Sequence, residues 1–325
     1  MKRRPVTVIG GGWSGERSIS LMSLRGVVEA LKVRGWGVDA VDLLPEMGRP
    51  RPATPAFAAP LRLSGLLKRL ARRPGTVAFL ALHGTGGEDG RIQGLLELAG
   101  VPFTGSGTLA SALAMDKALA KVVLEAAGVP VPKGCLVPKG APVPCCALPA
   151  VVKPLAQGSA LGLSLVRSRS LLLEALKRAW RWDSAAVVEE YISGRELTVA
   201  VLGGRALPVV EIVPEHEFYD FHSKYVKGGS RHLCPAILGV SKAVHAQDLA
   251  LRAHRALRCR AFSRTDMILG SDGRFRVLEV NTLPGLTPVS LLPDAARAAG
   301  LDYGELLEAM LKSSLEEAQW PSTKD

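Results

Sequence analysis

Residues 264–281 constrain the fold of this chain more than any other segment, because they have the pattern of two strands joined by a tight turn. The dipeptide Asp272-Gly273 lies between two mainly apolar stretches. Asp-Gly is favoured at the centre of a two-residue type I′ hairpin turn. We therefore expect an antiparallel hairpin here.

In that hairpin, polar side chains gather at one end of one sheet face. Counting outward from the two-residue turn places Asp266 opposite Glu279. The next pair on the same face sets Arg264 opposite Asn281, because side chains alternate with a period of two. The hairpin is therefore expected to bring two carboxylates, an amide and a guanidinium together.

This polar cluster is interpreted either as a solvated strand edge or as a metal site. The strands are otherwise apolar on both faces, so carboxylates there are costly unless a cation or Arg264 neutralises them. Oxygen atoms of Asp266, Glu279 and Asn281 suit Mg²⁺, which completes its shell with phosphates and water. We favour the metal site. An arginine beside it suggests phosphoryl transfer, in which charge neutralisation does most of the catalysis.

The composition excludes a membrane-spanning protein and disfavours a nucleic-acid-binding one. The chain has 325 residues, 47% of them hydrophobic, enough for two or three domains. No apolar run approaches the ~18–20 residues of a membrane-spanning helix, and Val6–Ile9 is too short for a signal peptide, which predicts a cytoplasmic location. The net charge is +11, but the basic residues are scattered along the chain and only 5% of residues are aromatic. We therefore favour a generally basic protein over one that binds nucleic acid.

The five cysteines have no CxxC spacing, which predicts reduced, mostly buried thiols.

A second motif, Gly10–Gly15, offers an alternative function. It fits the GxGxxG pattern after a strand and before a helix, and Asp39 or Asp42 follows at the end of the next strand. That setting can hold a dinucleotide pyrophosphate, which makes a dinucleotide-dependent oxidoreductase the competing hypothesis. The pattern is weak evidence, because any glycine-rich turn between a strand and a helix satisfies it.

The periodicity of apolar residues changes midway along the chain. Strands at 6–9, 38–43 and 77–82, alternating with helices at 18–33 and 61–72, predict an N-terminal α/β domain with a parallel sheet. From 150 onward the pattern favours an α+β half with mixed antiparallel strands. The remaining expected elements are a loop at 45–60, a helix at 109–127, a linker or irregular edge at 128–149, strands near 150–153, 163–166, 186–191, 196–202, 207–213, 265–269 and 275–280, and helices at 170–179, 245–258 and 304–315.

Several segments, in matching order and spacing, resemble D-alanine–D-alanine ligases of the ATP-grasp superfamily. They are GGWSGERSISL (11–21), ALHGTGGEDGRIQGLLELAGVPFTGSG (81–107), LASALAMDKALAK (109–121), VVKP with QGSALGLS (151–164), VVEEYISGRELTVAV (187–201), FYDFHSKY (218–225) and SRTDMIL with VLEVNTLPGLTPVS (263–290).

The resemblance implies a Rossmann-like N-terminal domain followed by a two-subdomain ATP-grasp fold. The implied division is 1–107 for the N-terminal substrate-binding domain, 108–188 for the small central subdomain and 189–325 for the large C-terminal subdomain with the metal site. The implied reaction joins two D-alanines through an acyl phosphate, with release of ADP and phosphate, for peptidoglycan precursor synthesis. D-alanine and ATP would be the small-molecule partners, and the resemblance also implies a homodimer.

On the nucleotide side, the resemblance implies ATP and a pair of Mg²⁺ or Mn²⁺ ions. The implied metal ligands are those of the hairpin: Asp266, Glu279 and Asn281. The implied nucleotide contacts are Lys117, Lys153 and Lys224 to phosphates, Gly158 and Ser159 in a glycine-rich lid, Glu189 and Glu196 to hinge and ribose, and Glu190, Tyr191 and Ile192 along the adenine.

On the substrate side, the resemblance implies one pocket for each D-alanine. Glu16 and His83 match residues around the first. Arg264 and the backbone N–H of Gly285 match oxyanion stabilisers, and Ser290 with Leu291 matches the carboxylate pocket of the second. Glu16, Ser159 and Tyr225 match a hydrogen-bonded triad that links a mobile loop to the site.

The chain departs from the family pattern at a few positions. Ala160 stands where a second serine is common, and Phe221-His222 replaces the more usual Tyr-Glu. Ligases that make D-alanyl-D-lactate typically lack the tyrosine that corresponds to Tyr225, so its presence favours the dipeptide. A related ligase with D-lactate or D-serine as acceptor stays open as an alternative.

Overall fold

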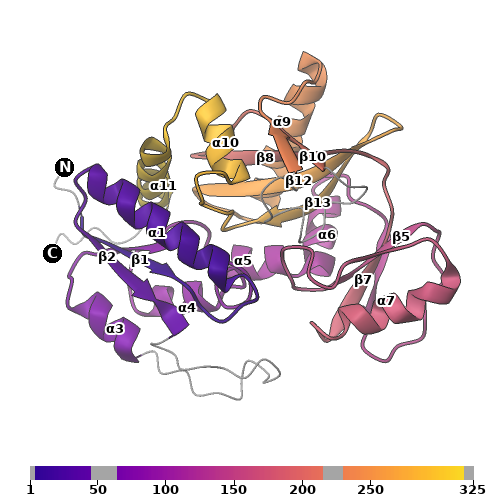
Figure 1. Cartoon of the computed structure of the whole chain (residues 1–325), viewed down its shortest axis with the longest axis horizontal. Coiled ribbons are helices and arrows are strands. Elements are labelled where there is room, and N and C mark those ends of the chain that lie inside the picture. Colours follow the sequence, from indigo (N-terminus) through magenta and orange to yellow (C-terminus); the bar gives the residue numbers. More distant parts are fainter. Residues whose placement is uncertain (1–3, 45–63, 215–229, 318–325) are drawn as a thin grey trace.

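The computed structural model describes residues 4–44, 64–214 and 230–317, which form three sheets with helices packed around them (Figure 1). The expected loop at 45–60 lies outside the described residues. None of the described helices is long and apolar enough to cross a membrane.

The first sheet is parallel, as the alternating pattern predicts. Its strand order is β2-β1-β3, and β1 pairs in parallel with both neighbours. The elements of this region are β1 (Val6–Gly10), α1 (Arg17–Val33), β2 (Val38–Asp42), α3 (Ser64–Ala71), β3 (Val77–Leu80) and α4 (Arg91–Leu98). The helix α4 was not expected from the sequence.

The second sheet is antiparallel, with strand order β4-β7-β5-β6. Its elements are β4 (Gly134–Pro138), β5 (Ala150–Pro154), β6 (Ser164–Val166), α7 (Leu172–Ala179) and β7 (Ala185–Glu190). Of the two expectations for 128–149, a linker or an irregular edge, the structure agrees with the edge, since five of these residues form the edge strand β4. The one proline of β4, Pro138, is tolerated because an edge strand needs ladder partners on one side only.

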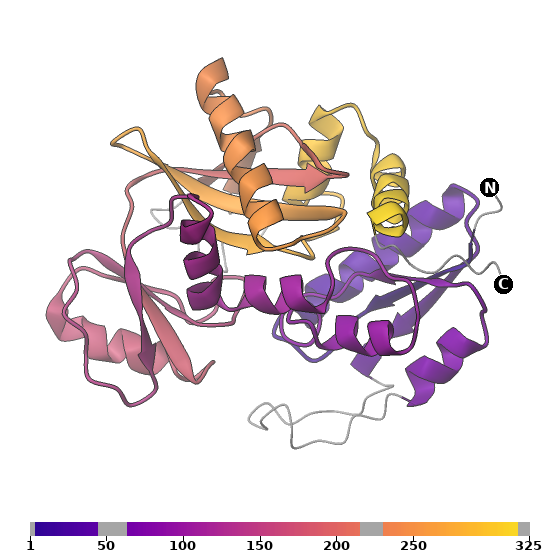
Figure 2. The same ribbon diagram turned by 180° about the vertical axis from the view of Figure 1, so that it is seen from behind.

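The third sheet is also antiparallel and lies beside the N-terminal region, which is drawn in indigo and purple (Figure 2). Strands β8 and β12 form its centre, and β12 pairs with β13 to give the expected hairpin. The elements are β8 (Gly194–Leu202), β9 (Arg205–Ala206), β10 (Val210–Pro214), β11 (Ser230–Leu233), α9 (Val240–Ala256), β12 (Phe262–Gly270), β13 (Phe275–Asn281), α10 (Leu291–Ala298) and α11 (Tyr303–Glu317). Neither β11 nor α10 was expected.

The hairpin has the predicted pairs at its open end but not the predicted turn. Gly273 alone has a positive φ of 76°, and the N–H of Gly270 donates to the carbonyl of Arg274, so the loop has three residues instead of two. A β-bulge next to Asp266 then shifts the register back by one residue. The longer turn and the bulge shift the register in opposite directions and cancel. Asp266 therefore pairs with Glu279 and Arg264 with Asn281, as predicted from the sequence.

The single helix expected at 109–127 is two helices, α5 (Thr108–Met115) and α6 (Lys117–Ala126). Asp116 separates them with an extended backbone (ψ 100°), and its carboxylate accepts hydrogen bonds from the N–H groups of Ala118 and Leu119. This is an N-cap, which satisfies free donors of the first turn. The break places Lys117 at the first position of α6, where its Nζ lies 3.6 Å from Glu279 Oε2 on β13.

The expectation of mostly buried thiols is wrong. Only Cys259 is buried, whereas Cys135 and Cys145 are exposed and the other two are half-buried. All five are free. Exposed cysteines on β4 and in the loop after it follow from the edge position of that strand, which burial patterns in the sequence did not reveal.

The packing of α9 against the third sheet buries one ionisable group, His254, which bonds through Nδ1 to Ser263 Oγ at 2.7 Å. Burial lowers the pKa of His254 to about 4. The unfolded chain therefore binds this proton from about pH 6.5 downward while the folded chain does not, so stability present at pH 7 is lost as the pH falls.

We expect the free energy of unfolding to fall by up to roughly 3 kcal/mol between pH 7 and pH 4 through this group, at 1.36 kcal/mol per pKa unit. His254→Asn, which keeps a hydrogen-bonding atom but no titrating one, should flatten the decline in urea titrations over that range. His245→Asn, on an exposed position of the same helix, is the control. An unchanged slope in His254→Asn would contradict the assignment.

Candidate functional site

Two adjoining cavities lie where the three sheets meet, and they share one wall. The first cavity is bounded by the start of α1, the ends of β12 and β13, and the loop before α10. The second cavity lies between the second and third sheets. Residues common to both are Lys117, Gln157, Gly158, Ser159, Ile212, Asp266 and Glu279.

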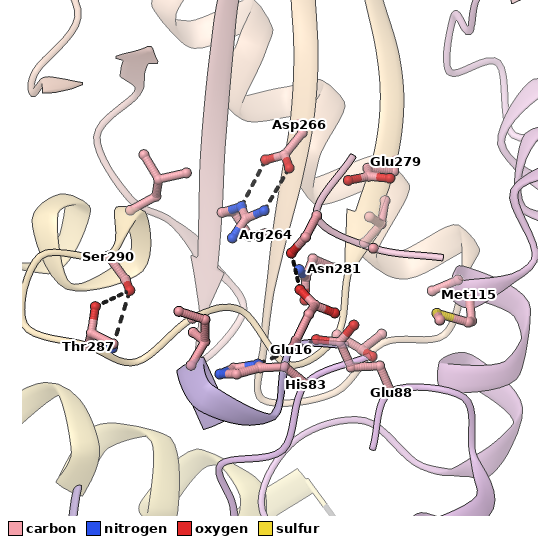
Figure 3. A pocket seen from close by; sticks show the side chains of 18 of the residues that line it. Glu16, His83, Glu88, Met115, Arg264, Asp266, Glu279, Asn281, Thr287 and Ser290 are labelled. Atoms are coloured by element: carbon pink, nitrogen blue, oxygen red, sulfur yellow. Dashed lines mark hydrogen bonds and ion pairs between the residues drawn. The ribbon is translucent and has the colours of Figure 1, made fainter. Parts of the chain in front are cut away.

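The open end of the β12–β13 hairpin forms the shared wall (Figure 3). Arg264 donates two hydrogen bonds to Asp266, Nε to Oδ1 at 2.8 Å and Nη2 to Oδ2 at 2.7 Å. Thr198 Oγ1 donates a third at 2.6 Å. Asp266 is only 6% exposed, and this bidentate pair supplies the neutralisation that a buried carboxylate needs.

Glu279 and Asn281 continue the polar end of β13 beside this pair. Glu279 Oε2 lies 3.6 Å from the Nζ of Lys117, which also donates to the carbonyl of Gln157 at 2.6 Å. The Asn281 side-chain oxygen accepts from the N–H of Leu283 at 3.1 Å. Burial lowers the pKa of Lys117, and the Glu279 carboxylate opposes that change.

The second cavity contains a buried carboxylate between lysines. Glu189 Oε1 lies 3.0 Å from Lys153 Nζ and 2.5 Å from Lys121 Nζ. Burial alone would raise the pKa of Glu189, but the two ammonium groups lower it below its usual value. Burial lowers the pKa of Lys121 to about 8. The end of β7, the connection after it and the start of β8 line the same cavity through Glu190, Tyr191, Ile192 and Glu196.

The start of α1 reaches the first cavity through Glu16, which is buried and accepts a hydrogen bond from Ser159 Oγ. Ser159 and Ala160 have positive φ angles of 52° and 56°, a conformation that non-glycine residues rarely adopt. A Cβ on Gly158 would stand 2.9 Å from a Glu16 oxygen. Glycine at 158 therefore lets the loop approach Glu16 closely.

His83 lies beside Glu16 and is fixed on both ring nitrogens (Figure 3). Nε2 is 3.0 Å from Ser23 Oγ, and Nδ1 is 3.1 Å from the carbonyl of Leu283. Glu88 Oε1 is 3.6 Å from Nδ1. Burial, with Glu16 nearby, raises the pKa of Glu88.

The far side of the first cavity is formed by the loop before α10. Ser290 Oγ lies 2.7 Å from Thr287 Oγ1 and accepts from the Thr287 N–H at 3.2 Å (Figure 3). Ser290 is the N-cap of α10, and Leu291 is its first residue. Gly285 lines the same cavity, as do Thr287 and Ser290.

The glycine turn after β1 does not form a dinucleotide site. The N–H of Gly11 donates to Ser20 Oγ at 2.8 Å, and Arg17 donates to the carbonyl of Gly12 at 3.0 Å. Asp42 is bound by Arg17 at 2.7 and 2.6 Å. The Gly11 N–H, the Gly12 carbonyl and Asp42 are thus bonded within the protein, and Glu16, which follows the turn, lines the first cavity.

Every predicted site residue that the structure describes lines one or both cavities. Lys224 and Tyr225, like the departure Phe221-His222, lie outside the described residues. Sequence reasoning missed Glu88, Lys121 and Thr287. Glu88 lies within segment 81–107 and Lys121 within segment 109–121, both of which resemble the family. Only the contact of Glu88 with His83 and that of Lys121 with Glu189 distinguish these two side chains from solvated charges.

Comparison with known proteins connects these cavities to one enzyme family. Models described as "D-ala D-ala ligase N-terminus" and "D-ala D-ala ligase C-terminus" match residues 61–106 and 142–312. The chain is 44% identical to the D-alanine–D-alanine ligase of Chelativorans sp., over 97% of this chain and 99% of that protein. It is 41% identical to that of Citrifermentans bemidjiense, over 97% of each.

Solved structures agree with the sequence relatives. The D-alanine–D-alanine ligase of Bacillus anthracis in complex with ATP superposes with a TM-score of 0.80 at 30% identity, covering 96% of this chain and 98% of that one. The enzyme of Coxiella burnetii gives a TM-score of 0.81 at 27% identity, covering 98% and 96%. By these matches along nearly its whole length, the chain belongs to the D-alanine–D-alanine ligase family.

Proposed function

We propose that this protein joins two molecules of D-alanine to D-alanyl-D-alanine, with ATP converted to ADP and phosphate. The γ-phosphoryl group passes to the carboxylate of the first D-alanine. The amine of the second then attacks the acyl phosphate carbon, and phosphate leaves. The dipeptide would serve peptidoglycan precursor synthesis, and the location would be cytoplasmic.

One observation carries the proposal: the two cavities of this family member meet at the wall that holds Lys117, Asp266 and Glu279. A phosphate donor in the second cavity and a carboxylate acceptor in the first would meet at that wall. Phosphoryl transfer depends mainly on positioning and charge neutralisation, and the wall has buried charges of both signs for this task.

The second cavity is proposed as the ATP site. Lys117 and Lys153 would contact phosphate oxygens, joined by Lys224, and the backbone around Gly158 and Ser159 would cover them. Along the base and ribose, the contacts would come from Glu189, Glu190, Tyr191, Ile192 and Glu196.

Asp266, Glu279 and Asn281 are proposed to hold a pair of Mg²⁺ or Mn²⁺ ions. The donor set fits, because two carboxylates and an amide oxygen converge at one sheet end, and oxygen donors are what Mg²⁺ prefers. Arg264 and Thr198 use three of the about four lone-pair sites of the Asp266 carboxylate, which leaves one on Oδ2 for a metal ion. The metal would neutralise charge on the phosphates during transfer.

The first cavity is proposed as the site of both D-alanines. Glu16 would hold the ammonium of the first beside His83, and Ser290 with Leu291 would hold the carboxylate of the second. Arg264 and the N–H of Gly285 would stabilise the oxyanion of the tetrahedral intermediate. The pairing of Glu16 and Ser159, with Tyr225 as third member, would keep water from the acyl phosphate.

The three sheets suggest how the chain divides. We propose an N-terminal Rossmann-like domain at 1–107 and the two ATP-grasp subdomains at 108–188 and 189–325, the last with the metal site. A homodimer is proposed from the family alone.

The first test measures phosphate release from Mg-ATP by purified protein with D-alanine, with L-alanine and with no amino acid. We expect release only with D-alanine, and a dipeptide in the mass spectrum. D-lactate and D-serine, added as competing acceptors, should yield little product. Folded protein that shows no D-alanine-dependent release would overturn the proposal.

A further inference from the structure

A buried charge cluster behind the second cavity contains one carboxylate oxygen shared by two ammonium groups. Glu189 Oε1 lies 2.5 Å from Lys121 Nζ and 3.0 Å from Lys153 Nζ. Lys121 also donates to the carbonyl of Pro132 at 3.2 Å. All three side chains are nearly inaccessible, at 10%, 10% and 3% for Lys121, Lys153 and Glu189.

The two lysines differ in what they can reach. Lys153 and Glu189 line the second cavity, whereas Lys121 lines neither cavity and sits behind Glu189 on α6. Lys121 thus has its ion-pair contact with the lining of the second cavity through Glu189. The positive charge of Lys121 balances the negative charge of Glu189. The positive charge of Lys153 is therefore in excess within this cluster.

We propose that Lys121 is a positioning residue for nucleotide binding, which acts as the permanent counter-ion of Glu189 and so frees Lys153 for a phosphate oxygen. The inference rests on the proposed ATP site. When Lys153 turns toward phosphate, Glu189 keeps a partner at 2.5 Å. Without Lys121, the same movement would leave a buried carboxylate unpaired, which is strongly unfavourable.

The protonation state of Lys121 agrees with this role. Burial lowers its pKa to about 8, with Glu189 opposing the change, so the side chain is still charged at neutral pH. The carboxylate that it faces is ionised as well, because Lys153 and Lys121 together hold the pKa of Glu189 below its usual value.

The test compares nucleotide binding in four proteins: wild type, Lys121→Met, Glu189→Gln and the double variant. A non-hydrolysable ATP analogue with Mg²⁺ is titrated by calorimetry. Lys121→Met should weaken binding on the order of tenfold to a hundredfold, while KM for D-alanine stays within about twofold. In the protein that already carries Glu189→Gln, Lys121→Met should change the affinity for the analogue by less than about threefold. The reason is that residue 189 then has no negative charge for Lys121 to neutralise.

Controls separate this role from a merely structural one. Lys139→Met removes an exposed lysine from the same region and should leave binding unchanged. Lys121→Gln keeps a donor without the charge, and it replaces the methionine variant if that variant does not fold. An equal loss in both Glu189 backgrounds, or no loss at all, would overturn the inference. Wild type that fails to bind the analogue would instead overturn the proposed ATP site.

Discussion

Replacing Glu279 by glutamine should lower kcat by at least about a hundredfold, the loss typical when a group that stabilises transferring charge is removed. Glu279→Gln keeps the shape of the side chain but removes the charge proposed to hold the metal. It also removes the carboxylate that lies 3.6 Å from the Nζ of Lys117. Burial already lowers the pKa of Lys117, and this carboxylate opposes that change. The variant should therefore need more Mg²⁺ for half-maximal activity, which a Mg²⁺ titration of phosphate release measures.

Asp272→Asn is the matched control. It removes a carboxylate from the same hairpin, at the exposed turn that bonds Arg276 and touches neither cavity. Its activity and Mg²⁺ requirement should equal those of the wild type. If Glu279→Gln keeps wild-type activity with an unchanged Mg²⁺ requirement, the metal assignment is wrong, and the cluster at the end of the hairpin serves only to neutralise Lys117 and Arg264.

The hairpin shows why local sequence patterns could predict that Asp266 and Glu279 lie together in this site. Alternation along two adjacent strands depends only on local geometry, so the facing of Asp266 and Glu279 follows once a hairpin is recognised. The turn itself was mispredicted by one residue. The bulge next to Asp266 compensated for it, and no glycine or proline marks that bulge in the sequence.

Contacts between segments that are far apart in the sequence could not be predicted from such local patterns. The approach of Ser159 to Glu16, and of Lys121 to Glu189, depends on how whole sheets pack, which periodicity does not describe. The family resemblance supplied the first pair through its motifs, but it named no partner for Lys121. Short elements such as α4 and α10 were missed because eight residues give little periodicity above the background.

Arg264→Met is expected to lower kcat by about a hundredfold to a thousandfold, the loss seen when one donor to a developing oxyanion is removed. KM for ATP should change little, since Arg264 lines the first cavity and not the second. The substitution also takes two hydrogen bonds from Asp266 and leaves it with Thr198. Steady-state kinetics with each substrate varied in turn would measure both effects.

Loss of stability and loss of catalysis can be separated by a second substitution. Arg264→Met with Asp266→Asn removes both charges of the pair and should recover part of the thermal stability, because no unpaired buried carboxylate remains, while activity stays low. Arg276→Met breaks another bidentate pair, in which Nη1 and Nη2 bond Asp272 (2.7 Å for both bonds), at the exposed end of the hairpin. It should leave kcat within about twofold, as expected for an exposed ion pair. If Arg264→Met loses stability but retains kcat, the guanidinium does no more than neutralise Asp266, and the oxyanion role falls to the backbone around Gly285.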